Sequence, residues 1–232
     1  MEVVKKSPEF LVLRMSADES LGNAIRRSVA EVPTLAIDEV EIFKNDSPLY
    51  DEMLALRLGL VPLKTEKGMT KKTKINLKLT KTGPCTVYSG DLQGNADVVY
   101  DKIPIVFLGE GQKLELAATA ILGRGLEHAK FIPGLCYYRH LLEIKSFSEA
   151  DSVIQNSKFS FIKPEKKGSK WLCDLNEAEV ERIEKLDKEA VSLSDEMLLV
   201  IESYGNMDAK DILTKAIDVL SDNVDEFAKA IK

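Results

Sequence analysis

The feature that most constrains the fold of this chain is an apolar seam near its C-terminus. Apolar side chains recur there at spacings of four, four, three, four, three and four residues, the nearly heptad period of a helix with one apolar stripe. The residues of this seam are Ala209, Leu213, Ile217, Leu220, Val224, Phe227 and Ile231. Asp208 precedes them as a candidate helix cap, and charged side chains occupy the opposite face. The seam must therefore be covered, either by a sheet of the same chain or by a second chain.

Strand and helix patterns at both ends of the chain accompany the seam. Residues 197–201 form a continuous apolar run, which is typical of a strand buried on both faces. The alternation in residues 10–14 predicts a half-buried strand, and a helix should follow it and end at Val32, before Pro33. One face of that helix is apolar or small, through Leu21, Ala24, Ile25, Ser28, Val29 and Val32. Residues 35–43 return to a strand pattern.

The middle of the chain is rich in predicted strands. A short leucine-rich helix is expected over residues 51–60. Beyond it, the alternation in residues 74–80 and 113–122 and the apolar run 103–108 predict a sheet with one solvent-facing side. Residues 163–190 begin as a lysine-rich irregular segment and continue as an acidic helix pattern, so they are expected to be an insertion or a linker.

Charge is unevenly distributed. The chain has 32 Lys and Arg against 38 Asp and Glu, a net charge of −6, so it is not a basic wrapper for nucleic acid. Residues 174–232 alone hold 16 acidic and 7 basic side chains. Two lysine-rich stretches lie upstream, Lys64 to Lys81 and Lys158 to Lys170. Each could contact phosphate, although a solvated strand or loop face is the simpler interpretation.

The cysteines indicate a reducing compartment. Cys85, Cys136 and Cys173 are separated by 51 and 37 residues, far from the spacing of metal-ligand pairs. This spacing argues against a disulfide framework, a zinc ribbon and an iron–sulfur cluster. The sequence also contains no apolar window of membrane-spanning length and no signal-peptide pattern at its start. We therefore expect a soluble, cytoplasmic protein.

Common catalytic motifs are missing from the sequence. It has no phosphate-binding loop, and its two histidines, His128 and His140, lie outside the usual metal and hydrolase motifs. Cys136 stands four residues before His140, so a thiolate–imidazole pair on a helix is formally possible but disfavoured. This inventory favours a binding or scaffolding protein over an enzyme.

Residues 21–42, Leu-Gly-Asn-Ala-Ile-Arg-Arg-Ser-Val-Ala-Glu-Val-Pro-Thr-Leu-Ala-Ile-Asp-Glu-Val-Glu-Ile, closely resemble the N-terminal signature of the alpha-like subunits of multisubunit RNA polymerases, specifically the archaeal D subunits. Further segments agree in order along most of the chain. They are 49–52, 57–63, 88–91, 100–105, 109–115, 123–125, 127–130, 133–134 and 202–208 with the helix that follows.

The resemblance implies an α+β fold with a discontinuous dimerisation domain, an antiparallel sheet with packed helices, and an inserted β-rich domain. The dimerisation domain would comprise residues 1–38 plus 195–232, and the insert residues 39–194. The resemblance also implies a non-catalytic subunit of a DNA-directed RNA polymerase whose active site lies in other chains. Such a subunit pairs with a small alpha-like partner, subunit L, to form a platform for the large catalytic subunits. It meets DNA only through the complex and contacts no membrane.

Candidate partner-binding residues follow from the resemblance together with the two helix patterns. We expect these apolar residues to face the partner or to support the surface that does: Leu21, Ile25, Val29, Leu213, Ile217, Leu220, Val224 and Phe227. Burial within their own domain is the alternative for each. Arg26 and Arg27 match the Arg-Arg pair of the family, which suggests contacts with a large subunit, and a surface salt bridge is the alternative.

One departure from the family concerns cofactors. Many relatives carry a cysteine-rich, ferredoxin-like insertion before the final strand, which holds iron–sulfur clusters. Here residues 171–193 contain Cys173 alone, so residues 163–194 are expected to be a reduced form of that insertion and no cofactor is predicted.

Two other hypotheses stay open from the residues. One is a free-standing nucleic-acid binder that uses the stretch from Lys64 to Lys81, for which charge reversal of Lys71, Lys72 and Lys74 should abolish the affinity. The other is a thiol enzyme built on Cys136 and His140.

Overall fold

A computed structural model of the chain describes residues 1–70 and 72–231; Lys71, in the first lysine-rich stretch, and Lys232 lie outside the described residues. The chain divides into two compact units, and each unit combines two separate segments. The first consists of Met1–Arg26 and Cys136–Glu202, and the second of Arg27–Leu135 and Ser203–Lys232. Within the described part of the chain, no helix has both the length and the apolar character needed to cross a membrane.

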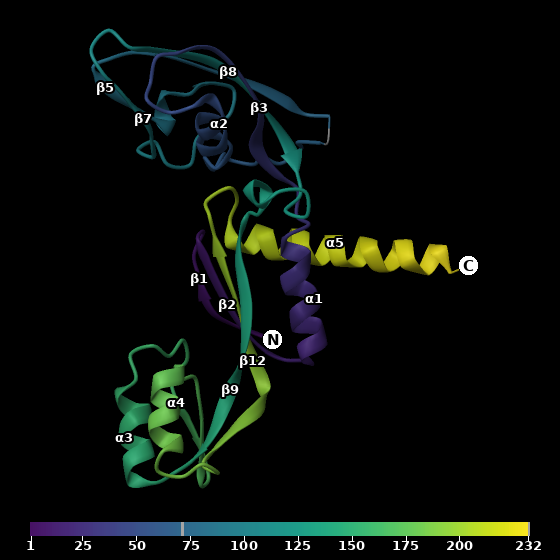
Figure 1. The fold of residues 1–232 in the computed structure, drawn as a ribbon. Helices are drawn as coiled ribbons and strands as arrows, with labels where there is room; N and C mark the ends of the chain where they lie inside the picture. Colours follow the sequence, from purple (N-terminus) through teal and green to yellow (C-terminus); the bar gives the residue numbers. More distant parts are fainter. Residues whose placement is uncertain (71, 232) are drawn as a thin grey trace. The chain divides into compact units, whose positions relative to one another are not determined.

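The first unit is built on a six-stranded sheet (Figure 1). In spatial order its strands are β1 (Glu2–Lys6), β2 (Phe10–Ser16), β12 (Val191–Ser203), β9 (Gly134–Lys145), β11 (Lys170–Cys173) and β10 (Glu165–Lys167). β2 and β12 pair antiparallel, with Leu13 opposite Leu199. The side chains of residues 197–201 are all 1% exposed or less, which confirms the prediction of a strand buried on both faces.

Helix α1 (Glu19–Val29) follows β2 in the chain, and its first half lies against β9 and β12. A Cβ placed on Gly22 would come within 3.1 Å of Met197 Sδ and 3.4 Å of Tyr138 Cγ. Because these contacts are so close, a larger residue would push the helix away from the sheet. The helix ends three residues earlier than expected, because the N–H groups of residues 30–32 bond carbonyls three residues back and tighten the last turn before Pro33.

The far end of the first unit has a small core of its own. Helices α3 (Ser148–Asn156) and α4 (Glu177–Glu184) pack there with residues of β9 and β11. The core residues are Ile144, Ala150, Ile154, Cys173, Leu175, Ile183 and Ala190. The start of α4 is capped reciprocally, because Glu179 N donates to Asn176 Oδ1 at 2.9 Å and Asn176 N donates to Glu179 Oε2 at 3.1 Å. The acidic helix expected in this segment is therefore α4.

The second unit contains a four-stranded sheet and a two-stranded sheet (Figure 1). The larger has the order β3 (Thr34–Asn45), β8 (Lys113–Gly123), β4 (Lys74–Thr82) and β6 (Gln93–Gly94), and the smaller pairs β5 (Cys85–Tyr88) with β7 (Pro104–Leu108). Helix α2 (Asp51–Gly59) contributes Leu54 and Leu58 to the core. Alternate β8 residues are buried and their neighbours are partly exposed, which confirms the expected sheet with one wet face.

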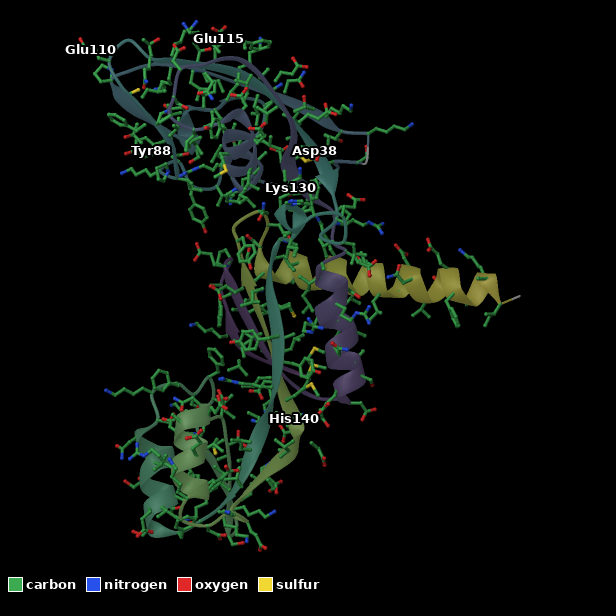
Figure 2. The ribbon with its side chains drawn as sticks, in the orientation of Figure 1. Asp38, Tyr88, Glu110, Glu115, Lys130 and His140 are labelled. Carbon is green, nitrogen blue, oxygen red and sulfur yellow. The ribbon has the colours of Figure 1, made fainter. Side chains whose placement is uncertain are left out.

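Short 3-10 turns and side-chain bonds complete the second unit. The turns are η1 (Ser89–Asp91) and η2 (Ala129–Phe131). In one of these bonds, Lys130 Nζ on η2 donates to Asp38 Oδ1 on β3 at 2.7 Å, and Figure 2 labels both residues.

Helix α5 (Ala209–Ala230) is the yellow helix that leads to the C-terminus in Figure 1. It is 22 residues long and belongs to the second unit. The loop before it is tied down by backbone and amide bonds. Asn206 Nδ2 donates to Leu63 O at 3.0 Å, and Thr65 N donates to Asn206 O at 2.8 Å. Gly205 has a φ of +93°, a left-handed conformation that a residue with a side chain rarely adopts. These features fix the start of α5 on its unit.

The mixed α+β class with antiparallel sheets is confirmed. The expected boundaries, 1–38 plus 195–232 and 39–194, stay a prediction, and the two compact units follow different ranges. The difference arises at two places. β9, β10 and β11 were placed in the insert but share a sheet with β2 and β12, and α5 was placed in the dimerisation domain but belongs to the second compact unit. The physical reason for the first difference is that a strand can form hydrogen bonds along both of its edges: β12 pairs with β2 along one edge and with β9 along the other.

Arg14 of β2 holds two carboxylates of the first unit. Its Nη1 lies 2.6 Å from Glu165 Oε1 on β10, and its Nε lies 2.5 Å from Glu196 Oε2 on β12. These hydrogen bonds from Arg14 hold the pKa of both carboxyl groups below their usual value, and those to Glu165 and then Glu196 raise the pKa of the guanidinium. Arg14 therefore links β2 to the neighbouring strand β12 and to β10, which stands last in the order of the same sheet.

We predict that Arg14→Met lowers the free energy of unfolding by about 2 kcal/mol at pH 7, because two partly buried carboxylates lose their charged donor. A carboxyl group with a depressed folded-state pKa stabilises the fold above its unfolded pKa and ceases to do so as the pH falls. The difference between the wild type and the variant should therefore shrink as the pH falls below 4.5, the ordinary Glu value. Urea unfolding at several pH values measures this, and a difference that is the same at pH 7 and pH 3 would contradict it.

Candidate interaction surfaces

One face of the first half of α5 is buried within the chain. Ala209, Ile212 and Ala216 are completely buried, and Val219 is partly buried. These residues follow three- and four-residue spacing, so they form one stripe along the first half of the helix. The burial of Ile212 and Ala216 was not predicted from the sequence, because the apolar face of this helix was assigned to the neighbouring heptad seam. Their own spacing of four was the signal that could have found them.

The seam itself is largely uncovered. Ile217 is 45% exposed, Val224 58%, Phe227 68% and Ile231 70%, whereas Leu213 and Leu220 are partly buried. Large apolar side chains grouped along one stripe at this exposure are unusual for a solvent-facing helix. The second half of α5 therefore presents an apolar surface that its own unit does not cover.

Residues 221–231 are exposed on every face of the helix. Among the side-chain bonds of the described residues, one joins this segment to the rest of its unit: Asn223 Nδ2 donates to Glu31 Oε2 at 3.2 Å. Packing within the chain thus holds the first half of α5 and leaves the second half free.

On α1 the predicted residues divide into two groups. Ile25 and Val29 are buried within the chain, whereas Leu21, Arg26 and Arg27 are exposed. The guanidinium of Arg26 donates to Asn23 Oδ1 through Nη2 at 2.9 Å and Nε at 3.2 Å. No ion pair of Arg26 or Arg27 is found among the described residues, so both charges are available to another chain.

A second exposed apolar stripe lies on α2 and was not predicted. Met53, Leu56 and Leu60 are about half exposed, and Tyr50, just before the helix, is largely exposed. Arg57 borders this stripe, and its Nη2 donates to Pro104 O of β7 at 2.7 Å. The sequence hid the stripe because residues 51–60 are apolar on both faces, so no period separates the core face from the outer one.

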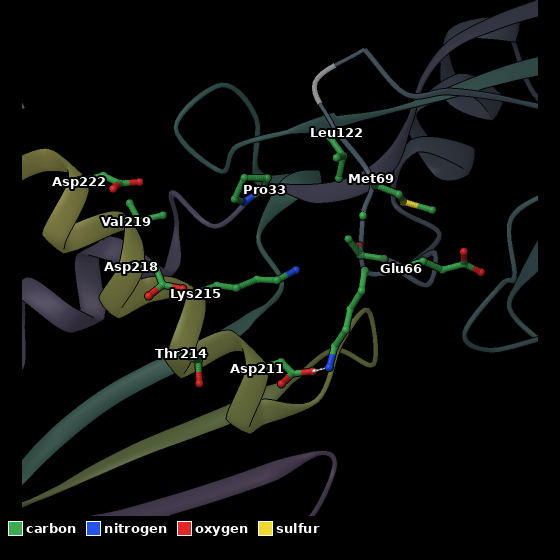
Figure 3. Close-up of a pocket in the computed structure, with 13 residues that line it drawn as sticks. Pro33, Glu66, Met69, Leu122, Asp211, Thr214, Lys215, Asp218, Val219 and Asp222 are labelled. Carbon is green, nitrogen blue, oxygen red and sulfur yellow. Dashed lines mark ion pairs between the residues drawn. The ribbon is translucent and has the colours of Figure 1, made fainter.

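A cleft of about 510 Å³ lies between α5 and the loop at residues 65–69 (Figure 3). Its apolar lining comes from Pro33, Met69, Leu122 and Val219, and its charged lining comes from Glu66, Lys67, Asp211, Lys215, Asp218 and Asp222. Lys67 Nζ lies 3.9 Å from Asp211 Oδ2 across the cleft. Four carboxylates and two lysines line the cleft, so its lining is acidic in balance.

The lysine-rich stretches are partly neutralised by nearby carboxylates. Lys81 pairs with Asp91 at 2.6 Å, and in the second stretch Lys170 pairs with Glu143 at 2.7 Å. Lys74 and Lys78 point outward from the exposed face of β4. Lys71 lies outside the described residues. These ion pairs reduce the positive charge that the two stretches could offer to nucleic acid. Contact with nucleic acid stays a prediction.

The cysteine–histidine pairing is contradicted by the structure. Residues 136 and 140 lie on strand β9 and not on a helix, so four residues separate them by about 13 Å. The ring nitrogens of His140, labelled in Figure 2, lie 2.9 Å from Ser194 O and 2.9 Å from Glu19 Oε1. Burial raises the pKa of the Cys136 thiol to about 12, which disfavours the thiolate nucleophile. The hypothesis of a thiol enzyme is therefore wrong.

The cysteines are dispersed as expected, and all three are free thiols. Across residues 1–70 and 72–231, no group of three or more His, Cys, Asp or Glu side chains is placed to hold a metal ion. The expectation that the chain has no iron–sulfur cluster stays a prediction.

Comparisons with known proteins agree with these features. Residues 40–133 match the family model described as the RNA polymerase Rpb3/RpoA insert domain. DNA-directed RNA polymerase subunit Rpo3 of Methanocaldococcus jannaschii is 31% identical, and the alignment covers 97% of this chain and 91% of the relative. Rpo3 of Halobacterium salinarum is 32% identical, with 92% and 89% covered. Rpo3 of Pyrococcus horikoshii is 31% identical, with 100% and 97% covered.

The chain belongs to the Rpo3 family of archaeal DNA-directed RNA polymerase subunits. The expected resemblance to the archaeal alpha-like subunits is thereby confirmed, and the protein is a subunit of the transcription machinery that works together with other polymerase chains. The matched insert domain begins within β3 and ends at the residue before β9, so the whole of it lies in the second compact unit. A cytoplasmic location stays a prediction.

We predict that Cys136 and Cys173 resist thiol reagents in the native protein at pH 7.5, because both side chains are buried and burial raises the pKa of each thiol to about 12. Cys85, which is less buried, should react first. Mass spectrometry after timed labelling measures the order, and labelling in urea is the control in which all three react. Native labelling of Cys136 before Cys85 would contradict the expected order.

Proposed function

We propose that this chain is a non-catalytic assembly subunit of a multisubunit DNA-directed RNA polymerase. It heterodimerises with the small alpha-like subunit, subunit L, and the pair forms the platform on which the large catalytic subunits assemble. The observation that carries the proposal is the exposed apolar seam of α5. The family membership supports the setting, because the relatives are named as polymerase subunits.

The chemistry of the seam suits a permanent protein interface. Ile217, Val224, Phe227 and Ile231 are exposed apolar side chains along one stripe of a helix. Burial of such side chains contributes about 25 cal/mol for each square ångström removed from water, and obligate interfaces are correspondingly apolar. A partner that covers this stripe would therefore gain most of its affinity from α5.

Residues beside the seam allow close approach. Ser221 and Ala228 flank Val224 on one side of the helix, and both side chains are small. Asp218, Asp222 and Asp225 lie away from the seam, so their charges stay in water when another helix packs on it. The surface thus resembles one half of a helix pair, with an apolar centre and a charged outer face.

A second part of the proposal concerns the large subunits. Arg26 and Arg27 are exposed on α1. A guanidinium in this position can pair with carboxylates of another chain through two hydrogen bonds. DNA would be met only through the assembled enzyme, in agreement with the acidic balance of the chain.

We predict that Phe227→Asp weakens binding to the small alpha-like subunit by about 100-fold or more, because a charge enters the apolar centre of the interface. Lys229→Asp is the matched control: it introduces the same carboxylate two residues away, on the opposite face of α5. Because it also replaces the basic residue of the last turn, it should weaken binding, but by less than about tenfold. Co-expression followed by titration calorimetry measures both. Equal effects of the two substitutions would refute the seam as the interface.

We predict that the double substitution of Arg26→Ala and Arg27→Ala leaves heterodimer formation within about twofold of the wild type. Recruitment of the large subunits should fall by about tenfold or more, because truncation of one partner of a buried charged pair leaves the other charge unpaired in the interface. Lys78→Ala, which removes an exposed charge on β4, is the control. Reconstitution from purified subunits with size-exclusion chromatography measures recruitment. Unchanged recruitment would remove these arginines from the platform.

A further inference from the structure

We propose that the second half of α5, residues 221–231, completes its helix only when the partner covers the seam. The inference rests on the proposed heterodimer and concerns how that interface forms. In the free chain this segment frays, and binding and helix formation occur together. Three independent features of the segment support the proposal.

The first feature is the lack of packing. The eleven residues from 221 to 231 are exposed on every face, whereas Ala209, Ile212 and Ala216 anchor the first half of the helix. One exposed hydrogen bond, from Asn223 to Glu31, links the segment to the body of its unit among the described residues. Since helices in water owe most of their stability to packing of an apolar face, little holds this half in place.

The second feature is local sequence. Residues 221–225 read Ser-Asp-Asn-Val-Asp, and all five belong to the weaker helix formers. The short polar side chains compete for backbone hydrogen bonds, and Val loses rotamer freedom in a helix. The run lies at the point where intramolecular packing ends, so propagation of the helix from its anchored half is weakest there.

The third feature is the charge at the helix end. Asp225 and Glu226 lie close to the C-terminal end of α5, where the negative end of the helix dipole disfavours acidic side chains, and Lys229 in the last turn offsets only part of this effect. A partner that buries Val224, Phe227 and Ile231 supplies the packing that offsets these unfavourable terms. The partner surface is therefore apolar and long enough to reach the end of α5.

Hydrogen exchange of the full-length chain, alone and in the heterodimer, tests the proposal directly. Amides of residues 224–231 should exchange rapidly in the free chain and slow by about tenfold or more in the heterodimer. Amides of residues 212–216 should be protected in both. If residues 224–231 are as protected in the free chain as residues 212–216, the proposal is overturned.

A pair of substitutions gives a second, independent readout. Asp225→Ala and Asp225→Gly remove the same exposed carboxylate away from the seam and differ in helix propensity. If folding is coupled to binding, the Gly variant should bind the partner about fivefold more weakly than the Ala variant, because about 1 kcal/mol of propensity is then paid on binding. If the helix is formed beforehand, propensity acts equally on both states and the two dissociation constants agree, which overturns the proposal.

Thr214→Ala and Thr214→Gly are the matched control in the anchored half of α5, where the two variants should bind within about twofold of each other. The outcome also separates this inference from the proposed function. A wild-type chain that does not bind the small alpha-like subunit refutes the heterodimer itself. Tight binding with protected residues 224–231 in the free chain keeps the heterodimer and overturns only the coupled folding.

Discussion

The antiparallel pairing of β2 with β12 is the interaction on which the rest of the first unit depends. It joins residues 10–16 to residues 196–202, so the two ends of the chain must meet before this sheet can form. The pairing is held by side chains that exclude water on both faces, through the fully buried residues 197–201 of β12. Arg14 adds a charged link from the same strand to Glu196 and Glu165. Each compact unit consequently consists of two separate segments of sequence.

The two halves of helix α5 differ in burial. Its first half is fixed by Ile212 and Ala216, which are buried within the chain. Its second half carries Val224, Phe227 and Ile231 into solvent. A helix that used all of its apolar surface for its own fold would have none left for a partner, so the length beyond the anchored stripe is what makes an interface available.

Different elements were predictable to different degrees. The buried strand at 197–201 and the solvent-facing side of β8 were predicted from the local pattern, because a continuous apolar run indicates burial on both faces and an alternation indicates burial on one. The position of β9 beside β12 did not follow, because local periodicity does not say which strands pair. For the same reason Cys136 and His140 were considered on a helix, whereas β9 holds their side chains apart. The α2 stripe was hidden because a helix that is apolar on both faces has no period to read.

The sequence by itself determined the family, the strand and helix types, and the existence of an apolar seam that must be covered by the same chain or by another one. Only the tertiary structure decided which apolar stripe of α5 is buried and which is free. The stripe through Ile212 and the seam through Phe227 are both apolar, and periodicity alone does not say which of them is covered. Burial is a property of what packs against a residue, so the division between core and interface appears only when the sheets and loops of the second unit take their places.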